Sequence, residues 1–311
     1  MTERKVSIGT DPEYFLRNTK TSSLVSAIPF IKGDKHNPVP LKNGGNIQSD
    51  NVAVEFATDP AKSTKDFISK IKAAISDTLN ELPKGFELAV LPSAEFNPSE
   101  LTDPKAKEFG CTPDYCAWEL TENNSPRHPN PNFRSCGGHV HVGCLNVDGT
   151  PTHVDTQFLL EPRGKILMIR GMDLFHGIIF TIFDNSKAAI ERKKLYGKAG
   201  CHRPTPYGVE YRALSNYWTK TPYSSMLVSS LVDDVVELII ADKLEGVINE
   251  VGEEDIQRII NTGNIDDAKS TLNKVLNNYL SEDSKFFIEE CLAKLGTSEN
   301  IAKEWAISIK S

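Results

Sequence analysis

The sequence predicts an α+β protein, and a contrast between two parts of the chain supports this prediction. The first two thirds of the 311 residues are interrupted by Pro, Gly and Asn and contain short apolar runs of the kind found in strands. The last third, from about Ser224, follows a helical pattern almost without a break. We therefore expect one domain over residues 1–223 and a helical C-terminal segment over residues 224–311.

The strand predictions rest on short runs with alternating polarity. Residues 6–8 and 14–16 read as strands on either side of an acidic turn or strand segment, and residues 52–57 alternate around Glu55. Three further runs of the same kind span residues 86–91, 138–144 and 209–214. The predicted sheet therefore draws on the chain from its start to about residue 214.

The clearest helix signal begins at Ser63. Apolar residues recur at helical spacing as far as Leu82, Asp66 occupies the capping-box position, and Pro83 and Gly85 end the pattern. Weaker helical patterns cover residues 155–160, 165–183 and 186–196. In the last third, helices are expected over residues 226–251, 255–260, 265–280, 283–295 and 299–309.

Composition excludes several classes of function. Lys and Arg number 35 against 42 Asp and Glu, so the net charge of −7 offers no basic field for nucleic acid. The longest apolar run, residues 175–183, is much shorter than a bilayer span, and no apolar segment follows the charges at the start of the chain. We expect a soluble cytoplasmic protein without nucleic-acid or membrane partners.

The six cysteines are expected to be reduced thiols. A zinc site can be drawn on paper from Cys111, Cys116, Cys136 and His139, but their spacing lacks the paired C-x2-C knuckles typical of zinc motifs. P-loop, dinucleotide-binding G-x-G-x-x-G and G-x-S-x-G hydrolase motifs do not occur. A cupin metal site is also disfavoured, because no Glu follows the two histidines within residues 142–149.

Charged residues nevertheless interrupt the predicted strands. Asp11 and Glu13 are two residues apart and point to the same face of a strand, where two carboxylates repel unless a cation lies between them. Glu55 stands between apolar neighbours and is either exposed on an open sheet or paired with a cation. A solvated edge turn, favoured by Asp-Pro, is the alternative for the first pair.

Two histidines form the next polar group. His139 and His141 share one face of a predicted strand, with valines on the other face and Gly137, Gly138 and Gly143 beside them. Glycines allow a ligand to approach the backbone closely. The pattern therefore favours a ligand or metal site over a structural role for both imidazoles.

The richest group lies between residues 191 and 212. Glu210 and Arg212 are two residues apart on a predicted strand, where a surface ion pair is the alternative explanation. Arg192, Lys198 and Arg203 precede them in a glycine-bearing segment and are suited to phosphate oxygens. Carboxylates, imidazoles and arginines on strand faces are what a magnesium-dependent ATP site without a P-loop requires.

These segments resemble a known family. The runs GTDPEYFL, VAVEFATDPAKS, FGCTPDYCAW, CGGHVHVG and LYGKAG, followed by PYGVEYRALSNYW, are similar to the carboxylate-amine ligase type 2 family, amidoligases found in phage genomes. The order of motifs also resembles the wider glutamine synthetase fold, which includes glutamate-cysteine ligases and guanidino kinases. The resemblance covers residues 6–218 and leaves the helical C-terminal segment unassigned.

The resemblance implies a twisted, mostly antiparallel sheet of the glutamine synthetase catalytic type, flanked by helices, that binds ATP with Mg²⁺ or Mn²⁺. The implied metal ligands are Asp11, Glu13, Glu55, His139 and Glu210. The implied catalytic residues are Arg212, Arg203 and His141, and the implied ATP-binding residues are Lys198, Arg192 and Arg134. Asp11 is shorter than the Glu common in the wider fold, which alters how two ions would be bridged.

The resulting hypothesis is an ATP-dependent ligase that phosphorylates a substrate carboxylate and lets an amine displace the phosphate. Its partners would be small-molecule or peptide carboxylates and amines, in the host cytoplasm if the protein is phage-encoded. Two alternatives remain open: phosphotransfer to a guanidino acceptor on the same fold, and a non-catalytic interaction protein that uses the helical C-terminus.

Overall fold

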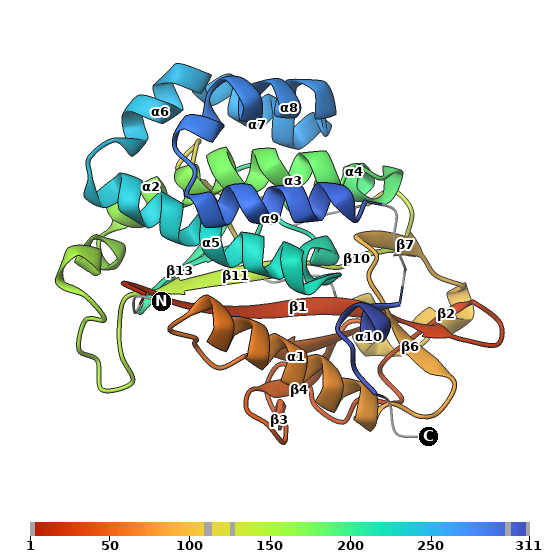
Figure 1. The fold of residues 1–311 in the computed structure, drawn as a ribbon. Coiled ribbons are helices and arrows are strands. Elements are labelled where there is room, and N and C mark those ends of the chain that lie inside the picture. Colours follow the sequence, from red (N-terminus) through yellow and green to blue (C-terminus); the bar gives the residue numbers. More distant parts are fainter. Residues whose placement is uncertain (1–3, 109–113, 125–127, 296–299, 309–311) are drawn as a thin grey trace.

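The computed structural model describes residues 4–108, 114–124, 128–295 and 300–308. A long sheet crosses the molecule, with helices layered against it (Figure 1). The predicted α+β class is confirmed. Residues 109–113, which include Cys111 of the zinc site considered above, lie outside the described part of the chain.

Eleven strands of the described residues form one sheet, and every pairing between its named strands is antiparallel, as expected. Its main path runs β3-β4-β5-β1-β11-β13-β12-β8-β9, while β2 and β6 pair with the far end of β1. A separate pair joins β7 and β10. The strands are β1 (Ser7–Asn18), β2 (Leu24–Val25), β3 (Val39–Pro40), β4 (Asn46–Asp50), β5 (Ala53–Ala57), β6 (Phe86–Ala89), β7 (Ser93–Glu95), β8 (Tyr115–Cys116), β9 (Thr121–Glu122), β10 (Phe133–Ser135), β11 (Gly138–Gly143), β12 (Cys201–Thr205) and β13 (Gly208–Tyr211).

Strand β1 is the centre of the sheet. It runs unbroken for 12 residues, so the segment around Asp11 and Glu13 is strand and not an edge turn. Its neighbours are β5 and β11, which places the two acidic side chains in the middle of the sheet. The predicted strands at residues 6–8 and 14–16 are therefore one strand.

The two faces of the sheet differ in polarity because side chains alternate along each strand. Val140 and Val142 are fully buried on one face of β11, and Val209 and Tyr211 occupy the same face of β13. Helices cover this apolar face. The polar side chains of the same strands point to the opposite face.

The predicted helix after Ser63 is confirmed as α1 (Thr64–Glu81), with the Ser63 hydroxyl accepting a hydrogen bond from the Asp66 backbone N–H at 3.1 Å. The predicted helical segment at residues 155–160 is a 3₁₀ helix, η3 (Val154–Leu160). The expected helix over 226–251 is wrong in continuity, because it breaks between α5 and α6. The remaining α-helices are α2 (Pro162–Met172), α3 (Ile178–Phe183), α4 (Lys187–Lys193), α5 (Pro222–Ile240), α6 (Leu244–Val251), α7 (Glu253–Thr262), α8 (Ile265–Lys274), α9 (Glu282–Ala293) and α10 (Ile301–Glu304).

Helices α2 and α3 are joined by one π-helical turn, η4 (Asp173–Gly177). Together they make a 22-residue helical run, Pro162–Phe183, that is long and apolar enough to cross a membrane. The apolar run at 175–183 is thus part of a longer helix than expected. Because 83% of its most apolar window is buried inside the protein, it is a core helix.

The C-terminal helices share the core of the sheet. Trp305 is buried in the same hydrophobic cluster as Val6 and Tyr14, and its indole N–H donates to the Thr219 carbonyl at 2.9 Å. The Arg4 guanidinium likewise pairs with Asp233 on α5 at 2.6 Å. The boundary at residue 223 falls inside α5, and the division into two domains stays a prediction.

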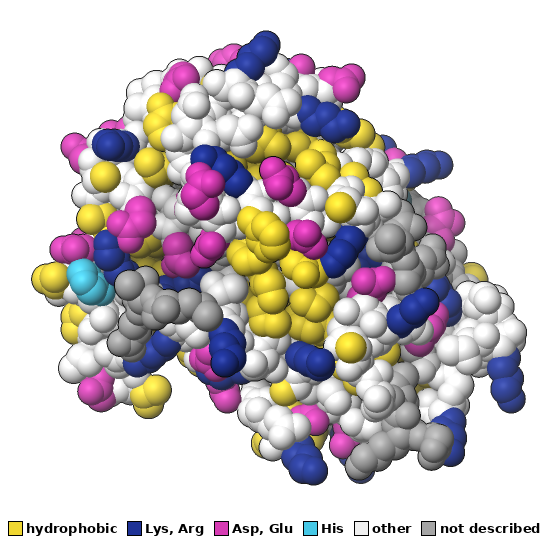
Figure 2. All heavy atoms as spheres, in the orientation of Figure 1, with side chains coloured by type: hydrophobic (Ala, Val, Ile, Leu, Met, Phe, Trp, Pro, Cys, Tyr) yellow, Lys and Arg dark blue, Asp and Glu magenta, His cyan; other side chains and the backbone are white. Residues whose placement is uncertain are grey.

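On the face of the molecule in Figure 2, lysines and arginines are interspersed with acidic side chains and do not form one basic area. The cysteines at positions 116, 136, 144, 201 and 291 are all free thiols. In the part of the chain that the structure describes, the clusters able to hold a metal contain no cysteine.

Candidate active site

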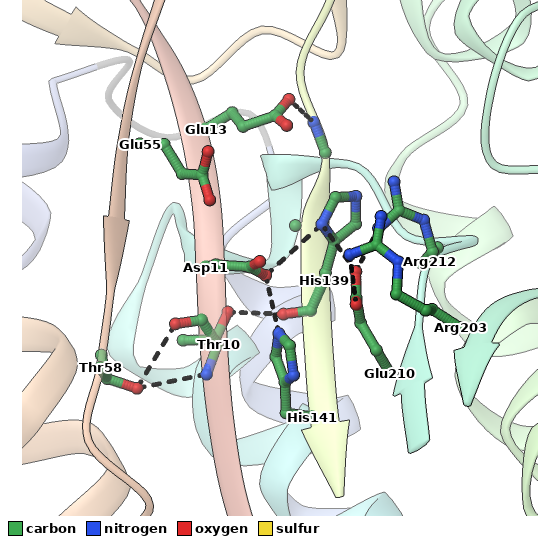
Figure 3. A network of polar contacts seen from close by, with 12 residues as sticks. Thr10, Asp11, Glu13, Glu55, Thr58, His139, His141, Arg203, Glu210 and Arg212 are labelled. Carbon is green, nitrogen blue, oxygen red and sulfur yellow. Dashed lines mark hydrogen bonds and ion pairs between the residues drawn. The ribbon is translucent and has the colours of Figure 1, made fainter. Parts of the chain in front are cut away.

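The strand registers bring the predicted acidic and imidazole residues together on the polar face. Asp11 on β1 is opposite His139 on β11, and Glu13 is opposite Glu55 on β5. His141 is opposite Glu210 on β13. Figure 3 shows these side chains pointing toward one another from four strands. Residues as far apart as 11 and 210 in the sequence therefore form one site.

One cluster is centred on Asp11. Its Oδ1 atom lies 3.1 Å from Nε2 of His141 and 3.4 Å from Nδ1 of His139. Nδ1 of His139 also lies 3.4 Å from Oε1 of Glu210. Ligand atoms of Asp11, His141 and Glu210 all lie within 4.8 Å of one another, a spacing that suits one metal ion. His139 and His141 thus face the same environment, as the strand pattern predicts.

Electrostatics in this cluster follow from burial and from the imidazoles. Burial alone would raise the pKa of the Asp11 carboxyl, but His141 and His139 outweigh it and hold that pKa well below its usual range. Burial is the largest single influence on His141 and lowers its pKa, but the charge and hydrogen bond of Asp11 together with the charge of Glu210 outweigh burial and raise that pKa overall. A cation in this cluster would replace the positive charge that the imidazoles supply.

A second cluster contains only carboxylates. Glu13 and Glu55 are joined by Asp50, at the end of β4, and one oxygen of each lies within 4.8 Å of the others. The Gly137 backbone N–H donates to Glu13 at 2.6 Å, and the Gln48 amide donates to Glu55 at 2.8 Å. Asp50 was not identified from the sequence, although Asn46, Gln48 and Asp50 repeat a polar residue at every second position.

The carboxylates of this second cluster repel one another when they are ionised. Burial raises the pKa of Glu55 well above its usual value, and the charges of neighbouring acids raise it further. Burial is also the main cause that raises the pKa of Glu13 and of Asp50. Carboxylate oxygens are the ligands that Mg²⁺ and Mn²⁺ prefer, so the donor set fits a divalent cation that would relieve the repulsion.

Two arginines frame Glu210. Arg203 on β12 donates to Oε2 of Glu210 at 3.0 Å, and Arg212 donates to Oε1. Arg212 also pairs with Asp114 at 3.2 Å, a partner that lies just before β8 and was not identified from the sequence. The Arg212–Glu210 pair is buried, with side-chain exposures of 5% and 2%, so it is not a surface ion pair.

A cavity opens at the Glu13 end of the polar face, and we call it the arginine cavity. Its lining includes Glu13, Asp50, Arg134, Arg192 and Arg212. Its volume is about 70 Å³, and its three arginines suit the oxygens of a phosphate group. An adjoining cavity of about 420 Å³, lined in part by lysines, shares Asp50 with it.

The three predicted ATP-binding residues lie in different settings. Arg192 is buried and donates to the Ala213 carbonyl at 3.1 Å, with its guanidinium at the cavity wall. Arg134 donates to the Ala106 carbonyl at 2.6 Å and to the Asn51 side chain at 2.9 Å. These hydrogen bonds indicate that Arg134 also stabilises the fold. Lys198 is exposed and lies outside the cavity lining, so its contact with ATP stays a prediction.

A second cavity, of about 470 Å³, lies at the opposite end of the polar face. Asp11 and His141 lie in its wall, and the Tyr207 hydroxyl is 2.7 Å from Nδ1 of His141. Its other lining residues are Ser7, Gly9, Thr10, Ala57, Thr58, Pro60, Gly143, Leu145, Asn146, Val147, Gly149 and Pro206. Asp11 and His141 thus join this cavity to the row of acidic residues.

Fold and site together define an α+β protein with clustered carboxylates and arginines on one face of an antiparallel sheet. The family model described as Phage phiEco32-like COOH.NH2 ligase-type 2 matches residues 87–290, well over half of the chain. The chain belongs to this family of carboxylate-amine ligases. His139, His141, Glu210 and Arg212 lie inside the matched range, whereas Asp11 on β1 precedes it.

No curated protein matches this sequence. Among solved structures, a bifunctional glutathione synthetase from Pasteurella multocida is similar at a TM-score of 0.49 and 11% identity, over 97% of this chain and 49% of that one. Apo GmaS is similar at 0.46 and 13%, covering 97% and 69%, and a novel glutamine synthase homolog at 0.39 and 11%, covering 94% and 71%. The chain thus spans about half the length of the first of these proteins. At these scores the similarities carry no argument about activity.

Proposed function

We propose that the protein is an ATP- and Mg²⁺-dependent ligase that joins a carboxylate to an amine through an acyl phosphate, with Mn²⁺ as the alternative metal. One observation supports this most strongly. Two groups of metal-ligating side chains, Asp11/His141/Glu210 and Glu13/Asp50/Glu55, lie side by side on one sheet face next to buried arginines. Such a face suits a polyphosphate and its cations.

The carboxylate cluster would hold one ion through Glu13, Asp50 and Glu55. Asp11 and Glu210 would hold another, with His139 and His141 beside them as nitrogen ligands. Bound Mg²⁺ supplies positive charge that neutralises phosphate oxygens. The Gly137 and Gln48 donors hold two of the carboxylates in place, so the ligands are oriented before any ion arrives.

The arginines would bind the transferring phosphoryl group. Arg212 and Arg203 are aligned by the same carboxylate, Glu210, so their planar guanidinium groups are fixed before substrate binds. Arg192 adds a buried cation at the wall of the arginine cavity. Preorganised charge of this kind stabilises a transition state more than it stabilises the bound substrate.

The cavities suit different parts of the reactants. The arginine cavity would hold a phosphate group, and the larger adjoining cavity of about 420 Å³ would hold the nucleoside. Among the residues that the structure describes, no lysine or arginine lines the second cavity, so it suits phosphates less well and we assign it to the other reactants. The acyl group and the phosphoryl group would meet near Asp11 and His139.

In the proposed reaction, a carboxylate oxygen attacks the γ-phosphorus of ATP, the bond to the bridging oxygen breaks, and ADP leaves. The amine nitrogen then attacks the acyl carbon, a C–N bond forms, and the C–O bond to phosphate breaks. The phosphate leaves with that electron pair and takes the proton from the amine. Glu210, Arg203 and Arg212 orient the phosphoryl group in the first step.

Hydroxylamine trapping tests this proposal. The full chain with ATP, Mg²⁺ and a panel of carboxylates should yield a hydroxamate from an acyl phosphate, and Glu210→Gln should abolish it. Glu122→Gln, which changes an exposed glutamate on β9, is the matched control and should keep the wild-type rate. A phosphorylated guanidino acceptor without hydroxamate would instead establish the phosphotransferase alternative. Failure to bind ATP at all would support the non-catalytic one.

The location of the protein follows from the same proposal. ATP and reduced thiols are features of the cytoplasm, so we place the reaction there, in the host cytoplasm if a phage encodes the chain. The family description refers to a phage. Fractionation of an expressing cell tests this location directly.

A further inference from the structure

Asp173 is a buried acid on the helix-covered side of the sheet, away from both carboxylate clusters. It begins the π-helical turn between α2 and α3, and its side chain is inaccessible to solvent. Single π-helical turns inside α-helices are rare and are found frequently at functional sites. The proposed reaction does not use this side chain directly, so its burial needs another explanation.

Three donors from three separate segments converge on the Asp173 carboxylate. Oδ2 accepts a hydrogen bond from the Trp118 indole N–H at 2.6 Å and another from the Gly200 backbone N–H at 2.5 Å. Oδ1 accepts from the Tyr211 hydroxyl at 2.8 Å. Burial is the main influence on this carboxyl and raises its pKa to about 7 in spite of these donors.

Each of the three segments also carries part of the arginine site. Tyr211 lies on β13 between Glu210 and Arg212, whose side chains point to the opposite face. Gly200 directly precedes β12, the strand of Arg203. Asp114, the second carboxylate partner of Arg212, lies four residues before Trp118 in the sequence.

The packing around Gly200 leaves little freedom for these segments to shift. Gly200 has a φ of +81°, and a Cβ there would lie 2.8 Å from Cδ1 of Trp118 and 3.0 Å from Sγ of Cys116. The turn therefore approaches Trp118 closely, and the Asp173 carboxylate connects both of them to β13. An apolar side chain of the same size would fill the space but would bind none of the three donors.

We propose that Asp173 is a positioning residue for the phosphate-binding arginines. It fixes β13, the start of β12 and the segment after β8 relative to one another from behind the sheet, and so sets the relative position of Arg203, Arg212 and their acidic partners. Loss of this connection lets the guanidinium groups shift. Bidentate binding of phosphate depends strongly on such geometry. The inference rests on the proposed function.

The test measures binding of the β,γ-imido analogue of ATP with Mg²⁺ by calorimetry, which requires no amide formation. Asp173→Asn should weaken binding about tenfold, an effect of about 1.4 kcal/mol. In an Arg212→Lys background the same substitution should weaken binding less than tenfold, because the part of its effect that acts through Arg212 is already lost. If Asp173→Asn fails to fold, Tyr211→Phe removes one of the three donors and should act in the same direction.

Asp234→Asn is the matched control. Asp234 is a buried acid on α5 that accepts hydrogen bonds from Ser281 at 3.3 Å and Ser284 at 2.6 Å, at the start of α9, and shares no hydrogen-bond partner with Asp173. The Asp234→Asn variant should be less stable than the wild type and should keep the wild-type affinity for the analogue. Equal loss of affinity in both variants, additive losses in the double variant, or unchanged affinity in a folded Asp173→Asn would each overturn the proposal. If the wild-type protein binds the analogue but forms no hydroxamate, the result would count against the proposed amide formation and not against the role of Asp173.

Discussion

Asp173 and the cluster of Glu13, Asp50 and Glu55 lie on opposite faces of the same sheet and differ in what surrounds them. Asp173, on the helix-covered face, accepts three hydrogen bonds. Glu13, Asp50 and Glu55, on the polar face, each place an oxygen within 4.8 Å of the others, and Glu13 and Glu55 accept one hydrogen bond each. Burial raises the pKa in both groups. A buried acid surrounded by donors stabilises the fold, whereas buried acids that face one another require a cation.

The largest effect is expected from Glu55→Gln. The substitution removes a charged ligand from the carboxylate cluster, so Mg²⁺-dependent turnover should fall about 10³-fold. The metal-free variant should be more stable than the wild type at pH 8, because one repelling charge is gone. Hydroxamate release and chemical denaturation measure the two effects. Glu95→Gln, which changes an exposed side chain at the end of β7, should change neither.

Glu13→Gln should behave in the same way as Glu55→Gln, because both carboxylates belong to one cluster. Nucleotide affinity that is insensitive both to a chelator and to these two substitutions would contradict the metal assignment.

Arg212→Lys is expected to have the next largest effect. Lysine keeps the positive charge but loses the planar fork that pairs with Glu210 and Asp114, so turnover should fall about 10²-fold. The fold should be retained, which circular dichroism can check. Wild-type hydroxamate production by this variant would mean that the pair has only a structural role.

Asp173→Asn should change stability in the opposite direction from Glu55→Gln. Asparagine keeps the shape of the side chain but presents an NH₂ group to donors, so the free energy of unfolding at pH 8 should fall by about 1–3 kcal/mol. Denaturant titration of the two variants in parallel provides the comparison. If both variants were more stable than the wild type, the three hydrogen-bond donors around Asp173 would not stabilise the folded state.

The smallest effect concerns pH and metal. Since the folded-state pKa values of Glu13, Asp50 and Glu55 are raised, the stability linked to them is present at low pH and is lost as pH rises above their unfolded values near 4. Mg²⁺ at ten times its dissociation constant should restore about 1.4 kcal/mol at pH 8 and almost none at pH 5, where protons compete. Thermal melts with and without Mg²⁺ test this, and Glu55→Gln should abolish the difference.

Local sequence pattern was sufficient for much of the site. Asp11 with Glu13, His139 with His141, and Glu210 with Arg212 are each two residues apart, so the period of a strand alone puts each pair on one face. Capping residues likewise predicted the start of α1. The helix over 226–251 was predicted as one piece because its apolar pattern continues through the break before α6.

What the sequence by itself determined is therefore the α+β class, most elements, and which side chains share a face of one strand. Only the tertiary structure decided which strands are neighbours, and with them the roles of Asp50, Asp114 and Asp173. Their signals were weak: Asp50 ends a short polar strand, and Asp173 is a single acid in an apolar helix. The physical reason is that strand register and buried hydrogen bonds depend on packing between segments that are separate in the sequence, which no local periodicity encodes.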